Sequence, residues 1–256
     1  MDYGNEGCSA RFATALGSHL AEEDAAAASP AAPAANFDLT NRLFVTNGVS
    51  HALDVISAVL ARPGDLCLTE AATYFLACDV FRSHGLDVDA APAAPDGSLD
   101  VAGLEASLRA GGRVPALIYC CPIHANPTGN TLGAADRARL VALARQFQFF
   151  IVADEVYHFL DWPAAGAEGP SKPARLAAFD PAFMDATAAG SAAISATDLY
   201  SSGAPMSADS KRPPAPKATG GVVVSVSSFS KILGAGLRIG WCEAAPDVIE
   251  HLRSHP

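Results

Sequence analysis

The 256-residue chain has little positive charge and no uninterrupted hydrophobic stretch of membrane-spanning length. Its 17 Lys and Arg are outnumbered by 27 Asp and Glu, which gives a formal net charge of −10. Proteins that bind nucleic acid present positive charge to the phosphates, so we expect no nucleic-acid partner. Pro, Gly, Asn or His interrupts the uncharged stretches, and no basic-then-apolar leader opens the sequence. These features predict a cytoplasmic protein that neither spans a membrane nor is secreted.

The sequence also lacks a C-x-x-C pair, although it has six cysteines. Cys120 and Cys121 lie close to His124, but adjacent residues of a strand point to opposite faces, so they do not predict a zinc site. We expect no bound metal. Most of the cysteines fall inside predicted strands and helices, which is typical of buried thiols in a reducing compartment. They are Cys8, Cys67, Cys78, Cys120, Cys121 and Cys242.

Strand-like segments alternate with helix-like ones along the chain, and 50% of the residues are hydrophobic, enough for a sizeable core. This alternation predicts an α/β fold, a three-layer sandwich around a mostly parallel, doubly wound sheet with sites at the carboxyl ends of the strands. Helices are expected at residues 9–20, 49–60, 74–84, 101–110 and 134–147, and strands at residues 66–69, 87–91, 116–120 and 149–153, with further strands flanking Lys231.

Two tracts have a composition that does not fit a compact core. Residues 22–36 are rich in Ala and Pro, and residues 162–221 are dominated by Ala, Ser, Pro and Gly with almost no periodic hydrophobic pattern. Such segments bury too little apolar area to offset the conformational entropy that ordering would cost. We therefore expect both tracts to lie outside the core.

A lysine follows a predicted buried strand near the end of the sequence. Lys231 comes after the apolar run that starts at Val222, with Ser228 and Ser230 just before it and Arg238 seven positions later. Desolvation there would lower the pKa of the lysine and leave an amine able to form a Schiff base with a carbonyl, for which pyridoxal phosphate is the usual partner. The hydroxyls and the guanidinium would donate to its phosphate. For this segment taken alone, a surface lysine that merely follows a strand is the alternative.

Two further blocks accompany the lysine. One is NPTG, beginning at Asn126, and the other is DEVY, which begins 28 positions later at Asp154, at the end of the apolar run FFIVA. Together the three blocks resemble the fold-type I pyridoxal-phosphate enzymes, specifically the class I/II aminotransferases. The resemblance extends from Tyr3 to about His255, apart from the two tracts. It implies that residues 1–256 form the large, cofactor-binding domain and that residues 162–221 contain an insertion.

The resemblance implies a cofactor, pyridoxal 5′-phosphate, and a role for each matching residue. Lys231 would be the catalytic residue, both the covalent tether of the cofactor and the group that moves a proton. Asp154 would pair with the ring nitrogen and keep it protonated, as the cofactor needs to act as an electron sink. Tyr157 and Asn126 would reach the phenolic oxygen. Tyr74 matches an aromatic ring that stacks on the pyridine, with a buried core tyrosine as the alternative.

The resemblance also implies a phosphate site. Gly48 would let the amides of Val49 and Ser50 approach an anion at the N-terminus of the helix expected at residues 49–60. Ser228, Ser230 and Arg238 would complete this site. Tyr3 matches a tyrosine that crosses to the partner's phosphate, which implies a homodimer. Arg42 and His124 remain structural or surface residues.

The activity that the resemblance implies is transamination between an amino acid and a 2-oxo acid. Relatives also have a small C-terminal domain, which supplies the arginine that binds the substrate carboxylate. The sequence ends at Pro256 without a match to that domain, so an inactive fragment is one expectation. A fold-type I lyase, such as a C–S lyase or decarboxylase, would use the same anchors. A pseudoenzyme or cofactor-sensing domain is a third hypothesis, and the sequence does not assign an amino-acid substrate.

Overall fold

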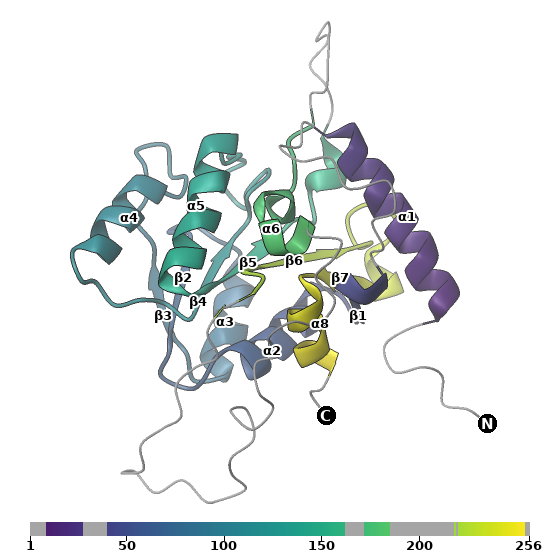
Figure 1. Cartoon of the computed structure of the whole chain (residues 1–256), viewed down its shortest axis with the longest axis horizontal. Coiled ribbons are helices and arrows are strands. Elements are labelled where there is room, and N and C mark those ends of the chain that lie inside the picture. The colour runs from purple at the N-terminus through teal and green to yellow at the C-terminus, as the bar shows by residue number, and fades with distance from the viewer. Residues whose placement is uncertain (1–8, 28–39, 162–171, 185–217, 219, 254–256) are drawn as a thin grey trace, which may run out of the picture.

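The computed structural model describes residues 9–27, 40–161, 172–184, 218 and 220–253 (Figure 1). Within them, seven strands form one sheet in the order β1-β7-β6-β5-β4-β2-β3. β7 is antiparallel to β1 and β6, and every other neighbouring pair is parallel. The strands are β1 (Leu43–Thr46), β2 (Leu66–Thr69), β3 (Asp87–Ala90), β4 (Leu117–Cys120), β5 (Phe150–Asp154), β6 (Val223–Ser228) and β7 (Gly240–Glu243).

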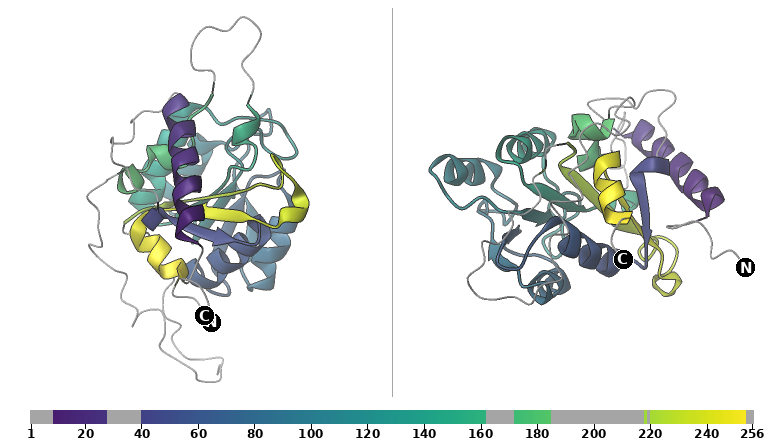
Figure 2. Two further views of the ribbon diagram at one scale, coloured as in Figure 1. Left: turned by 90° about the vertical axis from the view of Figure 1, so that its right-hand side faces the viewer. Right: turned by 60° about the horizontal axis from the view of Figure 1, so that its bottom comes forward.

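Helices cover both faces of this sheet, which makes three layers (Figures 1 and 2). α2 and α3 lie on one face, α4, α5 and α6 lie on the other, and α8 packs against α2 and β1. The predicted three-layer α/β fold with a mostly parallel sheet is therefore confirmed. The α-helices are α1 (Ala10–Ala26), α2 (Val49–Leu60), α3 (Phe75–Ser83), α4 (Val101–Arg109), α5 (Ala134–Phe147), α6 (Pro181–Met184) and α8 (Pro246–Arg253). The 3-10 helices are η1 (Thr40–Arg42), η2 (His158–Leu160), η3 (Leu176–Phe179) and η4 (Ala235–Leu237).

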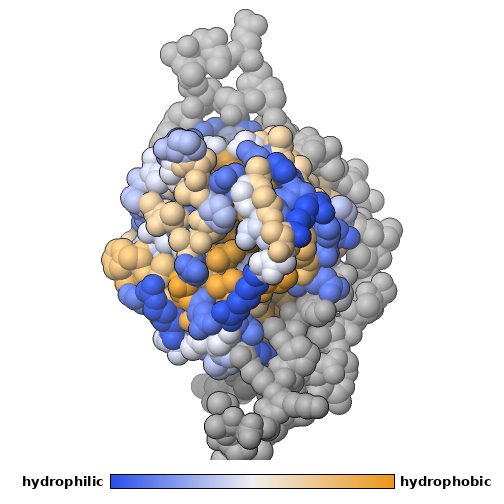
Figure 3. Space-filling model, turned by 90° about the vertical axis from the view of Figure 1, so that its left-hand side faces the viewer, coloured by the Kyte–Doolittle hydropathy of each residue, from blue (hydrophilic) through white to orange (hydrophobic). Residues whose placement is uncertain are grey.

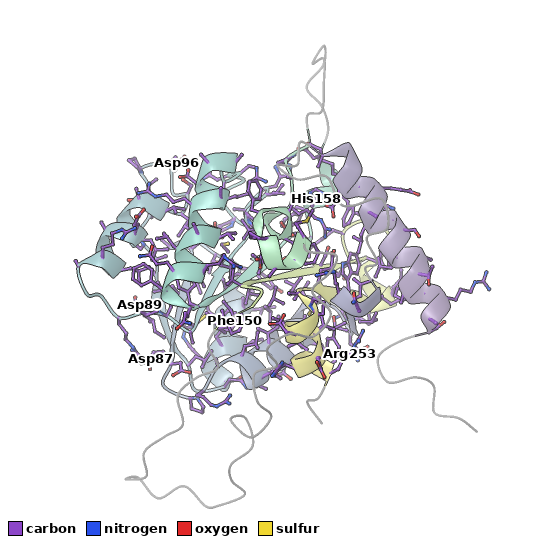
Figure 4. All side chains as sticks on the ribbon, in the orientation of Figure 1. Asp87, Asp89, Asp96, Phe150, His158 and Arg253 are labelled. Carbon is purple, nitrogen blue, oxygen red and sulfur yellow. The ribbon has the colours of Figure 1, made fainter. Side chains whose placement is uncertain are left out.

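The central strands are buried on both faces, whereas an edge strand carries charge. Every residue of β4, β5 and β6 is buried, as expected for parallel strands between two helical layers, and Phe150 lies in the middle of the molecule in Figure 4. At the edge, β3 exposes Asp87 and Asp89 (Figure 4). Charges on an edge strand disfavour pairing with a further strand. On the side of the molecule seen in Figure 3, hydrophilic residues surround a central hydrophobic area.

Most of the predicted elements lie within one or two residues of their observed bounds, and those at 49–60, 66–69 and 134–147 match. The prediction of α1 is wrong at its C-terminal end, because the helix continues to Ala26 and so enters the Ala/Pro tract. Residues 22–26 are Glu, Glu, Asp and two Ala, most of which favour a helix. β1 was not predicted. No described helix is both long enough and apolar enough to cross a bilayer.

The expectation that residues 162–221 lie outside the core is wrong for residues 172–184 and for Ala218. Leu176 and Ala177 of η3 and Phe183 of α6 belong to the hydrophobic core. Between η3 and α6, Asp180 accepts hydrogen bonds from the amides of Val222 (2.7 Å) and Val223 (3.1 Å). Residues from the two sides of the 185–217 gap therefore meet at the start of β6.

A buried arginine joins this segment to α1 and to the sheet. Arg175 donates to both carboxylate oxygens of Asp24 on α1, at 2.8 and 2.6 Å, and also contacts Glu243 on β7. Burial alone would favour the neutral guanidine, but the carboxylates of Asp24 and Glu243 hold the pKa of Arg175 well above its usual value. One cation thus neutralises two carboxylates that lie more than 200 residues apart in the sequence.

Removing this cation should destabilise the fold, because it would leave two carboxylates without their counter-ion. We expect Arg175→Ala to lower the free energy of unfolding by about 3–5 kcal/mol in urea denaturation. The matched control is Arg82→Ala, since Arg82 pairs with Asp79 at 3.6 Å and its side chain is 59% exposed. That control should change the free energy by less than about 0.5 kcal/mol. Equal effects of the two substitutions would contradict this role for Arg175.

Candidate active site

A pocket of about 240 Å³ opens at the carboxyl ends of the central strands. Neighbouring parallel strands end at the same edge of a sheet, so β4, β5 and β6 bring residues from distant parts of the chain together there. The residues that line the pocket are Val49, Ser50, Tyr74, Tyr119, Asn126, Asp154, Val156, Tyr157, Ser228, Ser230, Lys231, Ala235 and Arg238. Every predicted site residue in the described part lines this pocket except Gly48, which adjoins it. Tyr3 lies outside the described residues.

Asp154 is the buried acid of the pocket. Its Oδ2 accepts a 2.6 Å hydrogen bond from the hydroxyl of Tyr119, whereas its Oδ1 is buried without a hydrogen-bond partner in the described part of the chain. Burial raises the pKa of Asp154, while the Tyr119 hydroxyl, the nearby Val156 amide and the charge of Lys231 oppose that rise. A buried carboxylate oxygen without a donor is costly. The arrangement therefore suits a ligand that brings a positively charged hydrogen-bond donor to Oδ1.

The N-terminus of α2 and Arg238 lie together at the pocket and form a cup lined by hydrogen-bond donors. Gly48 precedes α2 with φ of 85°, and the first-turn amides of Val49 and Ser50 have no acceptor within their own helix. Arg238 donates to the carbonyls of Asn47 (3.1 Å) and Ala235 (3.3 Å), which keeps the guanidinium at this helix end. A helix N-terminus beside a guanidinium favours an anion such as phosphate.

Glycine is required at two places in this cup. A Cβ on Gly48 would lie 2.8 Å from Nη2 of Arg238, and its positive φ is itself unfavourable for other residues. A Cβ on Gly240 would lie 2.7 Å from the Cα of Gly48. β7 therefore packs directly against the turn that precedes α2.

The two serines lie on the strand β6 side of the cup. Ser228 is buried at the end of β6, and its Oγ accepts a hydrogen bond from the amide of Ser230 at 3.3 Å. Both serines line the pocket with Lys231 and Arg238. The cup therefore offers hydroxyl donors in addition to amides and a guanidinium.

Lys231 lies in the turn after β6 and is exposed, so the expectation of a desolvated lysine is wrong for this chain by itself. The turn projects beyond the end of the buried strand, which leaves the side chain at the edge of the pocket. Its Nζ is 5.8 Å from the centroid of the Tyr157 ring, close enough for a cation–π contact. The lysine thus reaches the pocket even though solvent also reaches it.

Two half-buried tyrosines complete the lining. Burial raises the pKa of Tyr157, the charges of Cys121 and Asp154 add to the rise, and the Asn126 side chain opposes it. Burial and the charge of Asp154 also raise the pKa of Tyr74. Both phenols therefore keep their protons at neutral pH and can act as hydrogen-bond donors. Tyr74 lies at the pocket rather than wholly inside the core.

Sequence reasoning missed Tyr119 and Glu70. Tyr119 lies in an apolar strand, where only the need of a buried hydroxyl for a partner hints at a polar role. Glu70 is buried after β2 and accepts a 2.8 Å hydrogen bond from the amide of Cys121. Burial raises the pKa of Glu70 to about 7, the Cys121 amide opposes the rise, and the charge of Asp154 adds to it.

The remaining sequence predictions concern residues away from the pocket. Arg42 is buried with its guanidinium over the Phe183 ring, and His124 pairs with Asp161 at 2.9 Å, so both have structural contacts. The five cysteines in the described part of the chain are buried and free, as predicted.

Comparison with known proteins identifies the family. The sequence matches the family model for aminotransferase class I and II over residues 8–255. The chain belongs to the class I and II aminotransferases. The resemblance found from the NPTG, DEVY and lysine blocks is thereby confirmed. This family depends on pyridoxal phosphate.

Individual aminotransferases match only with part of their length. An uncharacterized aminotransferase of Saccharolobus solfataricus is 30% identical over 216 residues, which cover 82% of this chain and 42% of that protein. An aromatic-amino-acid aminotransferase of Thermococcus litoralis is 30% identical over 213 residues, which cover 82% of this chain and 40% of that protein. The chain spans about 40% of the length of these relatives.

Solved aminotransferase structures share the fold. A kynurenine aminotransferase from Pyrococcus horikoshii matches with a TM-score of 0.67 and 23% identity, over 99% of this chain and 50% of that one. An archaeal alanine:glyoxylate aminotransferase matches with a TM-score of 0.69 and 21% identity, over 98% of this chain and 49% of that one. The observed sheet and its helices are therefore those of the aminotransferase large domain.

The contact between Gly240 and the turn at Gly48 gives a stability prediction. Gly240→Ala would force the backbone of β7 and α2 apart, and we expect the free energy of unfolding to fall by about 1–3 kcal/mol in urea denaturation. Gly236→Ala is the matched control, because a Cβ on Gly236 would meet nothing within 4 Å. The control should be neutral within about 0.5 kcal/mol. If Gly240→Ala proved equally neutral, the close packing of β7 on this turn would be contradicted.

Proposed function

We propose that this chain carries the cofactor-binding site of a pyridoxal-phosphate-dependent aminotransferase, which transfers an amino group between an amino acid and a 2-oxo acid. The observation that carries the proposal is the meeting of three features in one pocket. They are Lys231, the anion-binding cup, and Oδ1 of Asp154, which has no hydrogen-bond partner among the residues that the structure describes. These three features match the amine, the ring-nitrogen acceptor and the phosphate site that such a cofactor requires.

The residues of the pocket fit pyridoxal phosphate. Oδ1 of Asp154 would accept the hydrogen bond of the protonated ring nitrogen, and Tyr157 and Asn126 would donate to the phenolic oxygen. The Tyr74 ring would stack on the pyridine. The amides of Val49 and Ser50, the hydroxyls of Ser228 and Ser230 and the guanidinium of Arg238 would hold the phosphate, in the cup that Gly48 keeps open.

The cofactor and the residues of the chain would each supply part of the chemistry. When bound, the cofactor supplies an electron sink that stabilises negative charge at the α-carbon of the substrate. The amine of Lys231 would take the α-proton and return it at a neighbouring carbon, as a general base and then a general acid. Asp154, kept as a carboxylate, would hold the proton on the ring nitrogen, so that the sink keeps its positive charge.

The names of the relatives suggest a substrate class. The Thermococcus litoralis protein and a Schizosaccharomyces pombe relative, 28% identical over 213 residues, are both named as aromatic amino acid aminotransferases. We therefore propose an aromatic amino acid as the amino donor and a 2-oxo acid as the acceptor. The relatives are much longer than this chain, so the proposal concerns the site that they share with it.

A homodimer is proposed as the assembly. Leu233 and Leu237, in the segment after Lys231, are 70% and 53% exposed, and Phe75, next to Tyr74, is 68% exposed. Large apolar side chains exposed beside a polar pocket favour association with another surface. A second copy of the chain would cover them and, by the family resemblance, bring its Tyr3 to the phosphate.

Turnover with an aromatic amino acid and a 2-oxo acid tests the proposed function. In the presence of pyridoxal phosphate, we expect the chain to form the new amino acid and the new oxo acid in equal amounts, and Lys231→Ala to be slower by about 10²–10⁴-fold. Lys172→Ala is the matched control, since Lys172 pairs with Glu23 away from the pocket.

Release of carbon dioxide or of a thiol, instead of the new amino acid and oxo acid, would favour a lyase. Cofactor binding without any turnover would favour an inactive fragment, a pseudoenzyme or a cofactor-sensing domain. Sedimentation velocity on the same sample tests the dimer.

A further inference from the structure

Tyr119, to which the sequence assigns no role, lines the pocket. It is fully buried on β4, with its ring packed edge-on against Phe81 at 5.6 Å between centroids. Its hydroxyl donates to Oδ2 of Asp154 at 2.6 Å. Hydrogen bonds to a carboxylate are shorter and about twice as strong as those between neutral groups. This bond is therefore a strong contact at the acid on which cofactor binding is proposed to depend.

The sheet register explains how the two residues meet. Tyr119 pairs with Val152 across β4 and β5, and Asp154 lies two residues beyond Val152 on the same strand. Residues two apart in a strand share a face, so Tyr119, Val152 and Asp154 lie on the same side of the sheet. A tyrosine is long enough to reach the diagonal position, where a shorter side chain would fall short. The geometry thus follows from two central strands, and no mobile loop is needed.

The hydrogen bond from Tyr119 makes the two carboxylate oxygens of Asp154 differ in their surroundings. Oδ2 is occupied by Tyr119, and Oδ1 remains the buried oxygen without a partner in the described residues. If Oδ2 lost its donor, either oxygen could turn toward the pocket, and the buried carboxylate would lose a bond that favours its charged form. The same contact therefore affects both the orientation and the charge of Asp154.

We infer that Tyr119 is a positioning residue that fixes the Asp154 carboxylate through Oδ2 and leaves Oδ1 for the ring nitrogen of the cofactor. The part of this inference that concerns the ring nitrogen rests on the proposed function. The part that concerns Asp154 itself does not, because the hydrogen bond belongs to the chain alone.

The other groups around Asp154 determine how its titration should respond. Apart from Tyr119, the titratable groups close enough to interact with it are Glu70, Tyr74, Cys120, Cys121, Tyr157 and Lys231. Among these, Lys231 bears positive charge, and it lies in an exposed turn where solvent screens it. Glu70 bears negative charge once it ionises. Neither group replaces the hydrogen bond from Tyr119, which favours the charged form of Asp154. Loss of the Tyr119 hydroxyl should therefore move the titration of Asp154 to higher pH.

The first experiment titrates Asp154 without cofactor. Carbon-13 NMR of the chain labelled at the aspartate side-chain carboxyls, with Asp154→Asn to assign the signal, gives the midpoint in wild type and in Tyr119→Phe. We expect a higher midpoint in Tyr119→Phe. Phe81→Leu is the control, because it perturbs the packing of the Tyr119 ring while keeping the hydroxyl, and it should leave the midpoint unchanged. An unchanged midpoint in Tyr119→Phe, or the same shift in both variants, would overturn the inference.

A second substitution covers the case in which Tyr119→Phe fails to fold. Fluorotyrosine incorporated at position 119 has a more acidic hydroxyl and donates a stronger hydrogen bond, so the Asp154 midpoint should move to lower pH. A shift in the opposite direction, or none, would count against the inference. Because the two substitutions predict opposite signs, a general loosening of the structure cannot produce both results.

The second experiment adds pyridoxal phosphate labelled with nitrogen-15 in the ring. We expect Tyr119→Phe to weaken binding about tenfold, the equivalent of one lost hydrogen bond, and to move the ring nitrogen signal from the protonated toward the neutral form. Unchanged affinity and an unchanged signal would overturn the part of the inference that concerns the cofactor. Failure of the wild type to bind would instead contradict the proposed function, while the cofactor-free titration would still decide the role of Tyr119.

Discussion

A buried carboxylate at the end of the central strand β5 is the constraint on which the pocket depends. Burial makes the charged form of Asp154 costly, and the Tyr119 hydroxyl, the Val156 amide and the charge of Lys231 offset that cost. One oxygen is left without a partner among the described residues. Such a group is tolerated where a ligand completes its hydrogen bonding, and a protonated pyridine is a ligand of that kind. The position of Asp154 follows from the sheet, since the carboxyl ends of β4, β5 and β6 converge there.

Glu155, the residue after Asp154, makes contacts that stabilise the fold instead of lining the pocket. Glu155 is buried and accepts hydrogen bonds from the Leu176 amide (2.7 Å) and from the Ser225 hydroxyl, on the side where Arg175 lies. Burial raises the pKa of Glu155 to about 7, and the positive charge of Arg175 opposes that rise. Adjacent side chains point in different directions. Asp154 therefore faces the pocket, whereas Glu155 lies on the side of Arg175, the residue that joins α1 and residues 172–184 to the sheet.

The sequence predicted those parts of this molecule that depend on local pattern. The hydrophobic periodicity of α2 and α5 and the apolar run before Asp154 specified their elements closely, and the motif blocks placed most of the pocket lining. Contacts that depend on register or on distant partners were missed. The reach of Tyr119 to Asp154 requires the pairing of β4 with β5, which periodicity does not reveal. Arg175 lies in a compositionally simple tract, and its partner Asp24 is 151 residues away in the sequence. The exposure of Lys231 depends on how its turn projects from the sheet, which the preceding apolar run does not specify.

We propose that this pocket binds pyridoxal phosphate through Lys231. The most direct test is to add pyridoxal phosphate to the chain, reduce the mixture with borohydride and locate the pyridoxyl group by peptide mass spectrometry. We expect stoichiometric modification of the peptide that contains Lys231, together with a visible absorbance band before reduction that is lost afterwards. Modification spread over other lysines, such as Lys172, with no band before reduction, would contradict it.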